Sequence, residues 1–482
     1  MAGSGESAPA TSLALRLAGW AHDLQPSRGD LELAHRSLLD TVAVTLAARD
    51  HRVTALASGL PEAARWAVAA HVLDFDDLHM ESTTHISAVC VPTALATGGG
   101  AKAYLAAAGV MARLGSALGW AHYSAGWHAT CTAGAPASAA GAAVALGLTK
   151  QQIATAIALA VPGAGGVQRA FGTDGKSLQV GFAVDTGIRA ARLAAAGARA
   201  DPSALDAWLS LVGGDPGAGQ AGLADQEPPS GRQSSGSQAV PGDQELPGGR
   251  QSAGSQSALS GPAVPGGRQS AGSQAVPDDQ EPPGGRRSSG SRAVLSGPAV
   301  PGGLAVKLYP CCYALQRPIS ALAELARVRP LDPSLVSRIV LRTPEAAVKP
   351  LIHHRPVTGL QAKFSLEYGA AAALLDGYPG FASFTDDAVR RPDAIRLAGL
   401  VETKLEPGGS WLLDGELEAA VHTRTGEIER ISQRFPPGSP ARPPTPDQLR
   451  AKLADCVAAL DTDPAAWSWD TAAEALREGL PS

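Results

Sequence analysis

A tandem repeat interrupts this chain of 482 residues and most limits how it can fold. The repeat consists of four 18-residue units across residues 229–300, each marked by an arginine: Arg232, Arg250, Arg268 and Arg286. Each unit is rich in Gly, Pro, Ser and Gln, so stacked units would have no continuous apolar core. Ordering such a segment costs roughly 1 to 2 kcal/mol per residue, which its few apolar side chains cannot offset. We therefore expect residues 213–302 to form a disordered surface loop.

A loop of this kind contributes little to stability, so deletion of residues 229–300 is expected to leave the melting temperature and any activity nearly unchanged. Residues 1–10 are likewise expected to form a disordered tail. Globular sequence should lie on both sides of the loop.

The sequence before the loop, residues 11–212, has the pattern of helices. Its first apolar residues fall on one helical face, namely Leu13, Leu17, Trp20 and Leu24. Strand-like alternation is scarce in this range. We therefore predict a helical domain for residues 11–212.

The sequence after the loop, residues 303–440, is mixed. Residues 337–343 and 415–427 alternate as strands do, whereas residues 361–377 have helical periodicity. These patterns predict a smaller α+β domain. A last helix begins near Thr445, with a proline at its first position, and residues 441–482 are expected to return to the helical domain.

Composition favours small-molecule chemistry. The net charge is -5 without a basic stripe, so we expect neither nucleic acid nor membrane as a partner. The five cysteines, an odd number without CxxC spacing, fit a reducing cytoplasm. Residues 1–20 lack the features of a signal peptide. Residues 133–148 are uncharged, but their small side chains and proline indicate a tightly packed helix rather than a membrane span.

One short stretch, HVLDFDDLHMESTTH at residues 71–85, concentrates carboxylates and histidines. It suits either a metal cage or a metal-free acid/base site. Asp76, Asp77 and Glu81 resemble the aspartate-rich magnesium motif of terpene synthases, but the second motif of those enzymes is missing and aromatic residues make up only 4% of the chain. His22-Asp23 lacks the upstream histidine of HD phosphohydrolases, and no HExxH zinc motif is present. We therefore expect no metal.

Further histidines and cations follow downstream in short motifs. They are His128 in GWHATCTAG, Lys176 in DGKSLQVG, Lys307 in KLYPCC, Arg355 in RPVTG, and Lys363 with Tyr368 in AKFSLEYG. Lysine and arginine hold carboxylates, while histidine and tyrosine move protons beside them. The set therefore predicts a site for a small carboxylic acid.

These motifs, in this order, resemble the MmgE/PrpD family, which includes 2-methylcitrate dehydratase, cis-aconitate decarboxylase and iminodisuccinate epimerase. The resemblance covers residues 11–212 and 303–482. It implies a mainly α fold with an α+β part: a large all-helical domain formed by both chain ends, plus a smaller inserted α+β lid domain. It also implies chemistry without a cofactor, and a homodimer.

The resemblance places six residues in the family's active-site cleft: Asp74, His85, His128, Lys176, Lys307 and Tyr368. We predict His128, His85, Asp74 and Tyr368 as catalytic residues, and Lys176, Lys307 and Arg355 as substrate-binding residues. Four positions depart from what the resemblance implies: Leu78 replaces a threonine, Gln179 and Gln316 replace histidines that are common in the family, and Cys312 stands where decarboxylase-like members have a histidine.

The expected function is therefore that of a cofactor-independent lyase, a dehydratase or decarboxylase acting on a small di- or tricarboxylic acid of the methylcitrate or aconitate type. Two alternatives stay open. Proton exchange without loss of a group would make the same site an epimerase. The four departures could instead belong to a non-catalytic carboxylate-binding protein.

Overall fold

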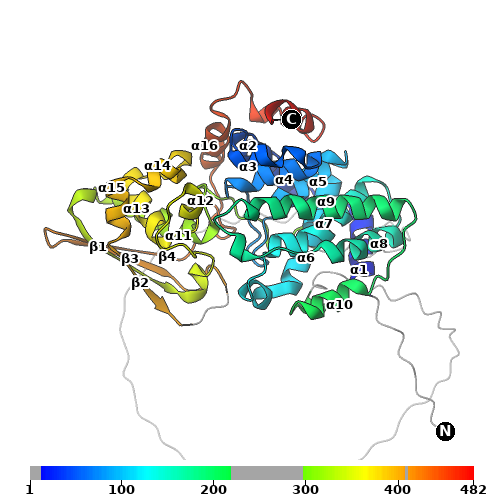
Figure 1. Ribbon diagram of the computed structural model, residues 1–482, viewed down its shortest axis with the longest axis horizontal. Coiled ribbons are helices and arrows are strands. Elements are labelled where there is room, and N and C mark those ends of the chain that lie inside the picture. Colours follow the sequence, from blue (N-terminus) through cyan, green and yellow to red (C-terminus); the bar gives the residue numbers. More distant parts are fainter. Residues whose placement is uncertain (1–11, 219–296, 408–410, 482) are drawn as a thin grey trace, which may run out of the picture. The chain divides into compact units, whose positions relative to one another are not determined.

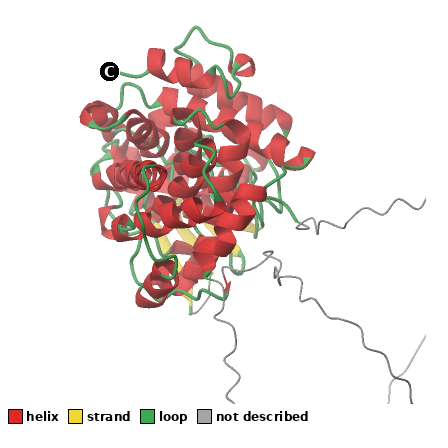
Figure 2. Cartoon of the chain, turned by 90° about the vertical axis from the view of Figure 1, so that its right-hand side faces the viewer, coloured by secondary structure: helices red, strands yellow, loops and turns green. Residues whose placement is uncertain are grey.

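The computed structural model describes residues 12–218, 297–407 and 411–481, and helices dominate these ranges (Figures 1 and 2). Before the repeat lie helices α1 (Leu13–Asp23), α2 (Arg28–Ala47), α3 (Arg52–Leu56), α4 (Glu62–Val72), α5 (Ile86–Ala96), α6 (Gly100–Ser124), α7 (Ala129–Ala145), α8 (Lys150–Ala160), α9 (Gly175–Ala195) and α10 (Ala204–Leu211). After it lie helices α11 (Tyr313–Val328), α12 (Gly359–Ala362), α13 (Leu366–Asp376), α14 (Asp386–Val389), α15 (Pro392–Ala398), α16 (Pro446–Val457) and α17 (Ala472–Gly479). The strands are β1 (Val336–Pro344), β2 (Val401–Glu406), β3 (Leu417–Thr423) and β4 (Ile428–Gln433).

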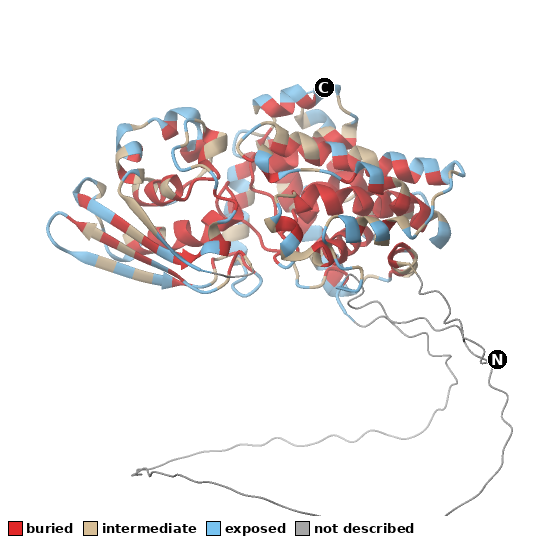
Figure 3. Ribbon diagram, turned by 60° about the horizontal axis from the view of Figure 1, so that its bottom comes forward, coloured by how far each residue is buried: buried red, intermediate tan, exposed pale blue. Residues whose placement is uncertain are grey.

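Helix α7 packs against α5, α6, α8 and α9 and is buried over most of its length (Figure 3). Its residues are mostly Ala, Gly, Ser and Thr, which lets neighbouring backbones approach closely. A Cβ atom added at Gly141 would lie 2.7 Å from the Ala107 side chain, and one at Gly187 would lie 2.5 Å from the Ser138 side chain. Small side chains thus allow the helices of this core to pack closely. Within the described residues, no helix is long and apolar enough to cross a membrane.

The C-terminal helices contact the N-terminal ones, because α16 and α17 both pack on α2 (Figure 1). A buried ion pair joins α16 to α2, with Lys452 Nζ 2.7 Å from Asp40 Oδ1. Segments from the two ends of the chain therefore share one core.

A second core surrounds a four-stranded mixed sheet in the order β2-β1-β3-β4. Strands β1 and β2 are parallel, while β3 is antiparallel to both β1 and β4. Buried and exposed residues alternate along β1 and β3, as the bands in Figure 3 show. Helix α11 packs on β3 and β4, and α13 packs on α11.

The structure is mainly helical with a small sheet, as predicted, but it corrects one element. The helix expected over residues 361–377 is divided into α12 and α13. The Ser365 side chain accepts a hydrogen bond from Tyr368 N and starts the second helix there. The predicted domain boundaries stay a prediction.

Residues 219–296, and with them most of the predicted loop, lie outside the described residues, as do residues 1–11. The C-terminal edge of the predicted loop is described, and its last residues are folded rather than disordered. Ala299 and Val300 are buried in the helical core. Arg113 Nη1 donates to Ala299 O at 3.1 Å, and Ala299 N donates to Asp30 Oδ1 at 2.7 Å. The last residues of the repeat are thus part of the fold, because they satisfy buried polar groups and fill core space.

Deletion of residues 229–300 should therefore lower the melting temperature, contrary to the expectation from composition. It removes the buried Ala299 and Val300 and leaves Asp30 and Arg113 without these partners, at a cost of about 2 to 5 kcal/mol. Deletion of residues 265–300 is a matched control. The sequence LSGPAVPGG at residues 295–303 also occurs at 259–267, so this shorter deletion recreates the same junction. Equal melting temperatures of the two variants in thermal denaturation would contradict the structural role of this segment.

Candidate active site

The candidate site forms around the segment that follows α4, where three successive backbone carbonyls each accept a hydrogen bond from a lysine. The pairs are Lys363 Nζ to Leu73 O at 2.7 Å, Lys307 Nζ to Asp74 O at 2.9 Å, and Lys452 Nζ to Phe75 O at 2.8 Å. All three lysines are buried and come from distant parts of the chain. Burial lowers the pKa of Lys363 to about 8.

Asp74 has a left-handed backbone with φ of 54°, a conformation that aspartate tolerates better than most residues. Its carboxylate pairs with Lys307 through one oxygen and lies 3.3 Å from Lys176 Nζ through the other. Burial raises the pKa of Asp74, but the two ammonium groups outweigh it and hold the pKa well below its usual range. Burial lowers the pKa of Lys307, and Asp74 and Asp76 reverse that effect and raise it. Asp74 therefore stays ionised.

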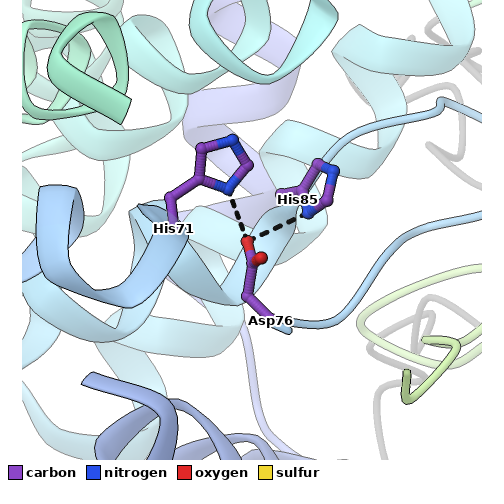
Figure 4. A group of neighbouring side chains, drawn as sticks. All are labelled: His71, Asp76 and His85. Carbon is purple, nitrogen blue, oxygen red and sulfur yellow. Dashed lines mark hydrogen bonds and ion pairs between the residues drawn. The ribbon is translucent and has the colours of Figure 1, made fainter. Parts of the chain in front are cut away.

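Asp76 joins two histidines through a single oxygen (Figure 4). Its Oδ2 lies 2.7 Å from His71 Nδ1 and 2.9 Å from His85 Nδ1. His71 Nε2 in turn lies 2.7 Å from Lys176 Nζ. Because an ammonium group can only donate, His71 Nε2 accepts, and its proton is on Nδ1, facing Asp76.

For His85 the tautomer follows from charge, because Asp76 Oδ2 lies 2.9 Å from His85 Nδ1 and a carboxylate beside a ring nitrogen favours the tautomer with the proton on that nitrogen. Its Nε2 then has the free lone pair. Burial lowers the pKa of His85 to about 3, despite the opposing charge of Asp76. His85 is therefore a neutral imidazole with Nε2 able to accept a proton.

His128 precedes α7, at the helix N-terminus. Its ring stacks on that of His71, with the ring centroids 5.6 Å apart, and makes a T-shaped contact with the ring of Phe171, with the centroids 5.1 Å apart. Burial lowers the pKa of His128 well below its usual range, and the neighbouring His71 and Lys176 lower it further. His128 is therefore also neutral.

One cavity brings the predicted residues Asp74, His85, His128 and Lys176 together. The other lining residues are Leu78, Thr83, Tyr123, Phe171, Cys312, Tyr313, Pro350, Phe364 and Leu412. The cavity volume is about 20 Å³, room for about one water molecule. Lys307 bonds to Asp74 without lining the cavity.

Tyr368 and Arg355, which the sequence places in the same site, line a different surface pocket of about 630 Å³. The Tyr368 hydroxyl donates to Ser383 O, and burial raises its pKa to about 12. The Tyr368 side chain faces the second core, where its ring packs on Phe384 and its hydroxyl makes this buried hydrogen bond. The structure therefore does not group these two residues with the other five.

Sequence reasoning passed over His71 and left the role of Asp76 open. The signal was present, because His71 stands three residues before Asp74 at the end of α4, facing the same turn. Two of the four departures from the family pattern, Leu78 and Cys312, line the cavity. Gln316 is buried, and its side chain accepts hydrogen bonds from the backbone of Leu308 and Tyr309. Gln316 thus shapes the loop that contains Lys307.

His71, Asp76 and His85 are the group in the described residues with spacing suited to a metal ion, their ligand atoms lying within 4.8 Å of one another. Two ammonium groups adjoin it, Lys176 on His71 and Lys307 at 3.9 Å from Asp76 Oδ1. A divalent cation would meet their repulsion and would have to displace the protons between the three side chains. The charges therefore favour three side chains held by a hydrogen bond and an ion pair rather than by a metal ion.

The buried histidines predict a stability that falls as the pH falls. Between about pH 6.5 and about pH 3 the unfolded chain protonates residue 85 while the folded chain does not, so the free energy of unfolding decreases toward acid pH. One such histidine contributes a slope of about 1.4 kcal/mol per pH unit. Urea denaturation between pH 7 and 4.5 should give a shallower slope for His85→Asn than for the unaltered protein. An unchanged slope would contradict a neutral His85.

Lys452→Met should destabilise the protein by about 3 to 5 kcal/mol, because the buried Asp40 loses its ion-pair partner and Phe75 O loses its hydrogen-bond donor. Burial already raises the pKa of Asp40 even beside Lys452. The matched control is Lys150→Met, which breaks an exposed ion pair with Asp23 and should cost under about 1 kcal/mol. Urea denaturation of both variants tests this, and similar losses would refute the special role of Lys452.

Comparison with known proteins identifies the family of the chain. The model of the MmgE/PrpD N-terminal domain matches residues 60–208, and that of the MmgE/PrpD C-terminal domain matches residues 309–473. No curated protein matches the chain. Every residue that lines the cavity falls within the two matched ranges. Because these ranges together cover more than half of the sequence, the chain belongs to the MmgE/PrpD family.

Proposed function

We propose that this protein is a cofactor-independent lyase that removes water or CO2 from a small di- or tricarboxylic acid of the methylcitrate or aconitate type. The MmgE/PrpD family generally comprises lyase-type enzymes. The observation that carries the proposal is the single cavity lined by an ammonium group, a carboxylate and two neutral histidines: Lys176, Asp74, His85 and His128.

Lys176 is the group best suited to bind a substrate carboxylate. It lines the cavity, and its 3.3 Å contact with Asp74 is looser than that of Lys307. The rings of Phe171 and Phe364 lie 5.7 and 5.4 Å from its ammonium group. An incoming carboxylate therefore meets a cation against apolar walls, where the attraction is poorly screened.

Elimination and decarboxylation both pass through a carbanion-like centre beside a carboxylate. Lys176 would stabilise the developing charge, and the histidines would supply the proton transfers and hydrogen bonds. The cavity must widen to admit a carboxylic acid, since its volume of about 20 Å³ holds only a water molecule. Closure around the substrate would then exclude water and strengthen these interactions.

Epimerisation of a small dicarboxylate is the second candidate, because two histidines face one cavity and could exchange a proton with the same carbon. Cys312 bears on which lyase reaction is favoured, dehydration or decarboxylation. It lines the cavity where decarboxylase-like relatives have a histidine, so this side chain favours dehydration over decarboxylation. A cytoplasmic homodimer remains part of the proposal.

The test is turnover of cis-aconitate, 2-methylcitrate and related acids by the purified protein, with and without EDTA. We expect turnover that EDTA leaves intact, and a loss of about 10- to 100-fold in kcat/KM for Lys176→Met, since a charge-assisted hydrogen bond is removed. Lys102→Met, an exposed lysine on α6, is the control and should retain activity.

Other outcomes would overturn the proposal in different ways. Turnover abolished by EDTA would exclude the metal-free mechanism. Racemisation without loss of a group would select the epimerase. Thermal stabilisation by these acids without any turnover would indicate a carboxylate-binding protein.

A further inference from the structure

We propose that Gln179 fixes the ring of His128 with its proton on Nε2, so that His128 acts as a neutral hydrogen-bond donor while His85 acts as the base. This assignment rests on the proposed lyase function for its catalytic consequence. The arrangement of ring protons itself follows from contacts among described residues.

The orientation of the Gln179 amide is set by the backbone of Val167. Gln179 Oε1 accepts from Val167 N at 3.0 Å, and Gln179 Nε2 donates to Val167 O at 3.3 Å. A flipped amide would place donor against donor and acceptor against acceptor. The carboxamide nitrogen therefore stays on the side of His128.

The backbone that orients Gln179 is itself fixed to His128. Trp127 and Val167 form an antiparallel bridge, and His128 N donates to Gly166 O at 3.0 Å. The distances between Gln179, its anchor and the imidazole are thus set by one local backbone pairing rather than by flexible side chains.

Gln179 Nε2 lies 2.6 Å from His128 Nδ1. An amide nitrogen can only donate, so His128 Nδ1 accepts and the ring proton is on Nε2. Cys131 Sγ lies 3.2 Å from the same Nδ1, and a thiol can also donate to it. His128 Nε2 is the ring nitrogen that neither residue engages, so it bears the N–H that His128 can offer to a substrate in the cavity.

His85 has the opposite arrangement, because the carboxylate of Asp76, 2.9 Å from its Nδ1, favours the proton on that nitrogen. Two histidines that line one cavity therefore differ in what their Nε2 atoms offer, a lone pair on His85 and an N–H on His128. An acceptor residue selects one tautomer and a donor residue selects the other. The two tautomers are therefore assigned from Asp76 and Gln179, the partners of the rings, rather than from the histidines themselves.

In dehydration, His85 Nε2 would take the proton from the substrate carbon next to a carboxylate, and the electron pair of that C–H bond would move toward the carboxylate oxygen. Its return would form the C=C bond and break the neighbouring C–O bond, and the hydroxide would leave as water with the proton from His85. The His128 N–H would donate a hydrogen bond to the carboxylate oxygen as its negative charge grows. A neutral imidazole is a poor proton source but a suitable donor to such an oxyanion. Two-base epimerisation is disfavoured, because only one of the two Nε2 atoms is free to accept a proton.

The test uses protein labelled with ¹⁵N in its histidine rings, with His128 assigned by comparison with His128→Asn. We expect the unaltered protein to show an unprotonated Nδ1 and a protonated Nε2 at residue 128. Gln179→Glu should reverse this pattern, because a carboxylate accepts where the amide donates. Protonated Nδ1 in the unaltered protein, or an unchanged pattern in folded Gln179→Glu, would overturn the inference.

Kinetics separate the positioning role from simple destabilisation. Gln179→Glu should lower kcat by about 100-fold with little change in KM, as expected for loss of an oxyanion donor. Gln152→Glu, which adds the same charge at the N-terminus of α8 and keeps its capping bond, should behave as the unaltered protein. A fall in kcat with Gln152→Glu as well would refute the specific role. If no acid is turned over, the lyase proposal fails, and the ring-proton measurement still decides the role of Gln179.

Discussion

Three lysine ammonium groups hold the backbone of residues 73–75, and the site depends on this interaction. The lysines are supplied by the loop before α11, by the turn before α13, and by α16. A buried carbonyl that loses a charged donor costs free energy, so these contacts tie distant parts of the chain to one short segment. They also stabilise the left-handed backbone of Asp74, a conformation that costs about 1 to 3 kcal/mol. The geometry of the candidate site is therefore determined by the tertiary packing.

Charge balance follows from the same segment. The carboxylates of Asp74 and Asp76 face the ammonium groups of Lys176 and Lys307, which leaves little net charge, and burial keeps His85 and His128 neutral. Neutral rings can be given different tautomers by their partners, which charged rings cannot. The pairing of lysine and aspartate thus prepares the site to bind an anion and to divide its work between two similar side chains.

The sequence could predict the type of chemistry better than the positions of all residues. Asp74, His85, His128 and Lys176 meet in one cavity, since each lies at or near a helix end, where the chain directs side chains inward. Tyr368 lies inside α13, and packing of that helix on α11 turns it toward the sheet core instead. Ordered motifs do not contain this information, because the direction of a helical side chain depends on which neighbours its helix meets. His71 was missed for a related reason, as its importance comes from Asp76 and Lys176 rather than from its own motif.

The buried Ala299 and Val300 have a consequence for how this protein can change in length. Of the four repeat residues that the structure describes, 297–300, Ala299 and Val300 belong to the core, and GPAVPGG occurs at the end of each pair of units. Gain or loss of a whole pair, as happens when repetitive DNA is misaligned during copying, restores the same residues at the junction. A change in length of this kind therefore keeps Ala299 and Val300, or their copies, at the junction where the core needs them.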